Sequence, residues 1–180
     1  IKTFLMRYEK QQIKTIIEKE ILRQGQIFYV APRIKDLENI RKNLINLMPE
    51  LKYEIIHGKL SNKQIEHSYE RFFNKKSSLL ISTAMIESGL DVSNVNTIII
   101  EKPYLFGLSQ LYQLRGRVGR SSRQAYAYLI IDDFRKLQEN SLKKLQIISK
   151  INSLGSGLSV ASNDLDLRGG GNIIGEEQSG

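Results

Sequence analysis

The chain has 180 residues, of which 41% are hydrophobic and 26% charged, a balance typical of a globular protein with its own core. Its formal net charge of +8 favours a polyanionic partner. The absence of cysteine excludes disulfides and thiolate metal sites and fits a reducing cytoplasm. No apolar run reaches the roughly 18 residues of a membrane span, so we expect no membrane partner and a cytoplasmic location. We also expect the chain to be a piece of a longer protein.

Hydrophobic periodicity predicts strands that alternate with amphipathic helices. In chain order we expect a helix over 8–23 capped by Gly25, a strand over 26–31, a helix over 36–48, a strand over 53–57, a helix over 61–73 opened by a capping box of Ser61 and Gln64, strands over 78–82 and 95–100, a helix over 108–115 and a strand over 125–131. This alternation predicts an α/β fold with a doubly wound, mainly parallel sheet and helices on both faces.

The pattern changes after the last predicted strand. Leucine and isoleucine recur at helical spacing over 134–151 with no strand behind them, and glycines are frequent from there to the end. We therefore expect one lobe over 1–133 and a helical or hairpin extension over 134–180 that is truncated at its C-terminus.

Polar residues and glycines follow three of the predicted strands, as Pro32-Arg33, His57-Gly58-Lys59 and Ser82-Thr83. Open parallel sheets bind ligands beyond the carboxyl ends of their strands, so this rim is a predicted site. His57 alone is more often structural, and neither it nor His67 has the neighbours that a transition metal needs. We predict no bound metal.

A separate signal comes from the segment 110–120, Gln-Leu-Tyr-Gln-Leu-Arg-Gly-Arg-Val-Gly-Arg, which has three arginines within six residues. On a helical turn Arg117 and Arg120 would share a face, while Arg115 would point elsewhere. The intervening glycines leave room for a ligand to approach. Two guanidiniums on one face suit phosphate oxygens, and the alternative is a basic surface turn paired with carboxylates. We expect the pair to lie near the rim formed by the strand ends.

The spacing Gln-x-x-Gln-x-x-Gly-Arg-x-Gly-Arg resembles motif VI of superfamily 2 helicases and translocases. That resemblance implies that the chain is the second of two RecA-like lobes. Arg117 and Arg120 would be catalytic arginines that reach ATP, and Gln113 would contact the nucleotide. The ATP, with its Mg²⁺, would be bound mainly by the first lobe.

Two further segments resemble elements of the same superfamily. Residues 82–92 resemble motif V, which implies that Ser82 and Thr83 hold a DNA phosphate, and that Gly89 and Asp91 approach the ribose and phosphate side of the nucleotide. The alternative is an ordinary loop with a capping threonine and a turn glycine. His57-Gly58 resembles the His-Gly element that grips a nucleic-acid strand.

The tail resembles the translocation motif shared by the transcription-repair coupling factors and the RecG branch-migration translocases. In that motif an arginine and a glutamine ten residues on lock a helical hairpin, and Arg168 and Gln178 have this spacing. The alternative is a flexible linker. The sequences over 154–157 and 175–180 favour the coupling-factor family, while Gly170 and Asn172 depart from the usual motif.

The resemblance implies a fragment of an ATP-dependent double-stranded DNA translocase that couples transcription to nucleotide-excision repair by displacing stalled RNA polymerase. RNA polymerase and an excision-repair damage-recognition protein would bind outside this fragment. A RecG-type branch-migration helicase is the alternative, and a non-catalytic nucleic-acid-binding module is the alternative class. The sequence has neither a Gly-x-x-x-x-Gly-Lys-Ser/Thr loop nor an Asp-Glu pair at a strand end, so we expect the chain alone to be inactive as an ATPase.

Overall fold

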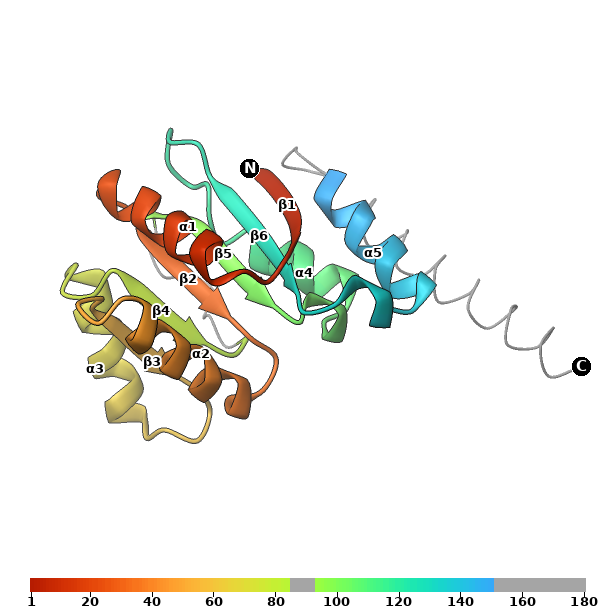
Figure 1. Ribbon diagram of the computed structural model, residues 1–180. Coiled ribbons are helices and arrows are strands. Elements are labelled where there is room, and N and C mark those ends of the chain that lie inside the picture. The colour runs from red at the N-terminus through yellow and green to blue at the C-terminus, as the bar shows by residue number, and fades with distance from the viewer. Residues whose placement is uncertain (85–92, 151–180) are drawn as a thin grey trace, which may run out of the picture.

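Strands and helices alternate through residues 1–84 and 93–150, which are the residues described by the computed structural model (Figure 1). The strands are β1 (Lys2–Arg7), β2 (Gln26–Val30), β3 (Tyr53–Ile56), β4 (Leu79–Ser82), β5 (Val95–Glu101) and β6 (Tyr126–Ile131). The helices are α1 (Lys10–Leu22), α2 (Ile34–Leu47), α3 (Asn62–Phe73), α4 (Leu108–Arg115) and α5 (Glu139–Lys150), with short 3₁₀ helices η1 (Pro103–Leu105) and η2 (Phe134–Lys136).

The strands form one sheet in the order β1-β6-β5-β2-β4-β3, and every neighbouring pair runs parallel. All residues of β2 and β4 are buried. Both faces of these strands are covered, which is why their sequences read as continuous rather than alternating hydrophobic runs. The predicted doubly wound α/β fold is confirmed.

Two hydrophobic cores lie on opposite faces of the sheet. Helices α1 and α2 cover one face and α3, α4 and α5 the other (Figure 1). Alternate residues of β2 divide between them: Ile27 packs in the α1/α2 core, and Phe28 stacks on Phe72 of α3 with ring centroids 5.8 Å apart. Leu145 and Ile148 of α5 are fully buried in the second core, so α5 packs on the lobe.

Strand β1 is absent from the sequence prediction. It lies at the edge of the sheet, where Phe4 is 43% exposed and the flanking Lys2 and Arg7 face solvent. Among the described strands β1 pairs with β6 alone, which begins at Tyr126. A half-exposed strand that pairs so far along the chain has neither a continuous apolar run nor a local turn signal.

The helix ends follow local chemistry. Ser61 and Gln64 form the predicted capping box at the start of α3. At the end of α1, however, the left-handed residue is Gln24 (φ 64°) rather than Gly25. The N–H of Gln24 donates to the carbonyl of Ile21 and that of Gly25 donates to Glu20, the two hydrogen bonds of a Schellman motif. The left-handed capping residue is therefore one position before the predicted Gly25.

Candidate functional site

The candidate residues divide between two opposite edges of the sheet. Because all strands run parallel, their amino ends share one edge and their carboxyl ends the other. Helix α4 returns from the carboxyl end of β5 to the amino end of β6. Residues 116–125, which follow α4 in the sequence, therefore lie at the amino edge. A Cβ added to Gly119 would lie 3.0 Å from Ile1 and 3.2 Å from Ala125, the residues that precede β1 and β6. The expectation that Arg117 and Arg120 lie at the carboxyl rim is wrong.

The arginine pair also lacks the helical turn that we predicted for it. Helix α4 ends at Arg115, and Gly119 adopts a left-handed backbone with φ 81°. Arg117 is half-buried and Arg120 is exposed. Within residues 1–84 and 93–150 neither guanidinium has an ion pair or a side-chain hydrogen bond.

Arg115 differs from this pair in being buried. Only 3% of it is exposed, and its Nη1 donates to the carbonyl of Ile148 at 3.3 Å, near the end of α5. The guanidinium lies 5.8 Å from the ring centroid of Tyr112. Burial lowers the pKa of Arg115. This arginine joins α4 to α5 and also lines a cavity at the amino edge.

Space beside the arginine segment is available at the amino edge. A cavity of about 530 Å³ is lined by Ile1, by residues of α4 and by the segment between α4 and β6, among them Tyr112, Gly116, Gly119 and Ser122. A Cβ at Gly116 would make only an ordinary contact with the carbonyl of Tyr112 at 3.4 Å. Gly119 is required both by its positive φ and by its tight packing, so close approach of a ligand is not the reason for this glycine.

At the carboxyl edge, His57 and Thr83 leave the sheet side by side, because β3 and β4 pair with their last residues aligned. His57 is half-buried, and its Nδ1 accepts a hydrogen bond from the backbone N–H of Lys59 at 3.2 Å. Gly58, which lies between His57 and Lys59 in this turn, is exposed, and Thr83 is half-buried. The structure thus brings together three of the residues predicted to hold DNA.

Ser82, the fourth predicted DNA contact, is only 1% exposed. It is the last residue of β4, which lies between β2 and β3 and is covered on both faces. Its hydroxyl has no hydrogen-bond partner among the described residues. This position does not fit a side-chain contact with DNA.

Other polar groups at the carboxyl edge pair with one another. Asp36 accepts hydrogen bonds from Lys102 at 2.7 Å and from Arg33 at 3.1 Å. Burial favours a higher pKa for Asp36, but these two cations hold the pKa below its usual value. Burial raises the pKa of Glu101 to about 7, although a 2.6 Å hydrogen bond from Tyr29 opposes the shift. Arg33, which was predicted as part of the rim, therefore forms an ion pair with Asp36.

Gln113 is exposed on α4, as a nucleotide contact requires. Gly89, Asp91, Arg168 and Gln178 lie outside the described residues, and their predicted roles stay predictions.

The sequence did not predict the side-chain hydrogen bonds at the amino edge. Ser121 donates to the buried side chain of Asn96 at 3.0 Å, and Arg23 and Arg123 bind the backbone of each other's turns. Arg123 follows Arg120 at the same three-residue spacing that links Arg120 to Arg117, and this spacing was the one available signal.

Comparison with known proteins decides the family. Residues 10–122 match the helicase conserved C-terminal domain. The chain belongs to this helicase family. The resemblance of the arginine segment to a helicase motif is thereby confirmed at the level of the family.

The chain has similar relatives over its whole length. It is 49% identical to a transcription-repair-coupling factor of Rickettsia prowazekii (strain Madrid E) and 43% identical to one of Myxococcus xanthus. Each comparison covers 100% of this chain but only 16% and 15% of the relative. The solved structure of RecG bound to a three-way DNA junction superposes with a TM-score of 0.77 at 32% identity, over 92% of this chain and 22% of that one. The higher identity favours the coupling factors over RecG.

Within residues 1–84 and 93–150, no helix is long and apolar enough to cross a membrane. No cluster of three histidine or acidic side chains in those ranges is arranged to bind a metal ion.

Proposed function

We propose that this helicase lobe supplies the arginine half of an ATP site in a double-stranded DNA translocase that couples transcription to excision repair. The observation that supports it is the pair Arg117 and Arg120 at one sheet edge: Arg120 is exposed, Arg117 is half-buried, and neither has a carboxylate partner among the described residues. Such guanidiniums are suited to charge that develops on a γ-phosphate. Gln113, Gly89 and Asp91 would contact the same nucleotide.

ATP and Mg²⁺ would be bound mainly by a first lobe that carries the phosphate loop. ATP supplies the phosphoryl group and its hydrolysis energy, and this chain contributes charge and closure of the interlobe cleft. We propose that residues 1–133 form the lobe. Residues 134–180 would be the translocation-motif extension, whose first helix packs on that lobe.

The carboxyl edge would grip DNA. His57, Gly58 and Thr83 lie together there, and exposed Lys59 adds positive charge. Small polar groups of this kind bind phosphates rather than base edges, so the lobe would track a duplex without sequence preference. The RecG structure, solved with a DNA junction, supports this assignment for a lobe of the same fold.

The whole-protein partners follow from the coupling-factor relatives. We propose that RNA polymerase and a damage-recognition protein bind domains outside this chain, and that the protein works in the cytoplasm. A RecG-type branch-migration helicase is the second candidate, favoured by the superposition with RecG. An RNA-polymerase-binding domain beside this lobe would indicate the coupling factor, and a wedge domain for branched DNA would indicate RecG.

The decisive experiment replaces Arg120 with alanine in the longer protein of which we propose this chain is one lobe. DNA-stimulated ATP hydrolysis should fall by about 10³-fold or more, the range of arginine fingers, while duplex binding is kept. Arg41→Ala is the matched control, because Arg41 pairs with Glu38 on the outside of α2. Unchanged turnover in Arg120→Ala would refute the proposed role.

Translocation coupling through the tail needs its own test. Arg168→Ala should keep ATP hydrolysis but lose strand displacement, because the hairpin would no longer follow the nucleotide state. Normal displacement of a triplex-forming strand by this variant would count against the assignment.

The alternative class, a non-catalytic nucleic-acid-binding module, is separated by the isolated 180-residue chain. A module should bind duplex DNA tightly, with a salt slope of about −0.9 for each phosphate contact. A half-site should bind weakly until the first lobe is present. Binding titrations at two salt concentrations distinguish these results.

A further inference from the structure

Two arginines exchange hydrogen bonds between the turn that ends α1 and the segment that follows the arginine pair. Nη1 of Arg23 donates to the carbonyl of Gln124 at 2.9 Å, and Nη1 of Arg123 donates to the carbonyl of Arg23 at 2.6 Å. We call these reciprocal bonds the arginine clasp. It joins two turns that are 100 residues apart in the sequence.

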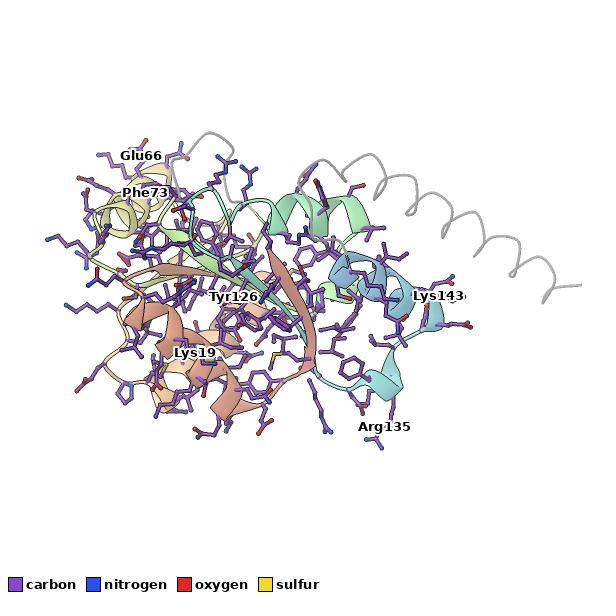
Figure 2. All side chains as sticks on the ribbon, turned by 90° about the horizontal axis from the view of Figure 1, so that it is seen from above. Lys19, Glu66, Phe73, Tyr126, Arg135 and Lys143 are labelled. Atoms are coloured by element: carbon purple, nitrogen blue, oxygen red, sulfur yellow. The ribbon has the colours of Figure 1, made fainter. Side chains whose placement is uncertain are left out.

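Arg23 is itself fixed on three sides. Its Nε and Nη2 bind both carboxylate oxygens of Glu20, at 2.8 and 2.7 Å, and Glu20 is 1% exposed. The hydroxyl of Thr97 on β5 donates to the same carboxylate at 2.6 Å. The guanidinium also lies 5.2 Å from the ring centroid of Tyr126, the first residue of β6, which is labelled in Figure 2. Only a planar fork can bind a carboxylate, an aromatic face and a carbonyl at once.

The clasp and its neighbours fix the chain on both sides of Arg120. On one side, Gly119 is packed against Ala125. On the other, Ser121 binds Asn96, which is 1% exposed. Arg120 itself stays exposed. The backbone that carries this guanidinium is therefore held while its side chain stays free to bind.

Capping of α1 accounts for only one of the two clasp bonds. The backbone N–H groups of Gln24 and Gly25 bind the carbonyls of Ile21 and Glu20, and Arg123 binds the carbonyl of Arg23, the C-cap residue of α1. The carbonyl of Gln124, which accepts from Arg23, lies outside that helix. The shared effect of the two bonds is to hold residues 121–124.

We infer that Arg23, held by Glu20, and Arg123 are positioning residues that keep Arg120 in place for phosphoryl transfer. This inference rests on the proposed ATP half-site. A displacement of about 1 Å in a catalytic group can cost roughly 100-fold in rate, so a fixed backbone at Arg120 has a direct kinetic value.

The test uses Arg23→Lys and Arg123→Ala in the longer protein. Lysine keeps the charge beside Glu20 but cannot also reach Gln124, and Arg123→Ala leaves the Glu20 pair intact. The kcat of DNA-stimulated ATP hydrolysis should fall by roughly 10-fold to 100-fold in both variants. The KM for ATP should change by less than about twofold, because ground-state binding is not what the clasp supports. Arg41→Ala should leave kcat unchanged.

A double-mutant cycle separates positioning from general stability. When Arg120→Ala is already present, adding Arg123→Ala should reduce kcat no further, because the clasp would act only through Arg120. A further loss of the full single-variant size would overturn the inference. So would an unchanged kcat in both clasp variants, even if their melting temperature falls.

Hydrogen–deuterium exchange distinguishes failure of this inference from failure of the ATP half-site. Arg123→Ala should speed exchange of the amides over 119–125 and leave those of α2 unchanged, and unchanged exchange over 119–125 would overturn the positioning role. If Arg120→Ala alone leaves turnover intact, the ATP half-site is wrong. The exchange rates then decide whether the clasp fixes this segment.

Discussion

Replacing Glu101 with glutamine is expected to stabilise the chain at alkaline pH. Glu101 ends β5 at the carboxyl edge, where burial, with a smaller contribution from the charge of Asp132, raises its pKa from 4.5 to about 7. The hydroxyl of Tyr29 donates to its Oε1 at 2.6 Å. Glutamine has the same shape and keeps an oxygen for that hydrogen bond, but it carries no charge that burial penalises.

The magnitude follows from proton linkage. The folded chain holds the proton of Glu101 to higher pH than the unfolded chain does, so stability is lost as pH rises from about 4.5 to about 7. With these two pKa values the penalty is about 1 kcal/mol at pH 5 and about 3 kcal/mol at pH 8. The free energy of unfolding of Glu101→Gln, relative to the wild type, should therefore rise by about 2 kcal/mol between pH 5 and pH 8.

Urea denaturation of the 180-residue chain at pH 5, 6, 7 and 8 measures this difference. Glu66→Gln is the matched control, because Glu66 is exposed on α3 (Figure 2) and its replacement should leave the shape of the pH profile unchanged. Parallel pH profiles for the wild type and Glu101→Gln would refute the assignment of a buried, proton-holding carboxyl to this site.

Three further substitutions test the packing, each by urea denaturation. Phe72→Ala should cost about 3–5 kcal/mol, because the ring is fully buried between α3 and the sheet. Gly25→Ala should cost about 1–3 kcal/mol, since the added Cβ would lie 2.5 Å from Oε2 of the buried Glu20 of α1. Asp36→Ala should cost about 3 kcal/mol because Lys102 loses its partner, whereas the exposed Glu38→Ala should cost less than about 1 kcal/mol.

Local sequence patterns were sufficient for most of the fold. The capping box of Ser61 and Gln64 and the bounds of α4 are where periodicity and capping chemistry place them. These features depend on residues within one or two turns of each other. Strand β1 depends instead on a partner at the other end of the chain, and no local pattern encodes that pairing.

The candidate site was predictable in its residue types but not in its layout. The rule that ligands bind beyond carboxyl strand ends located His57 and Thr83 correctly. Applied to Arg117 and Arg120 it failed, because a crossover helix carries its C-terminal residues back to the other edge. Burial of Ser82 depends on its sheet neighbours, which the sequence alone does not order.

The amino edge with Arg117 and Arg120 and the carboxyl edge with His57 and Thr83 lie at opposite ends of the same strands. Strand β5 has seven residues, so at about 3.3 Å per residue roughly 20 Å of stiff backbone separates its ends. If the two edges have the roles proposed above, a rotation of the lobe about its arginine edge would displace the opposite edge, and a displacement of about 3.4 Å would equal the rise of one nucleotide along a DNA strand. Such a displacement needs no change inside the sheet.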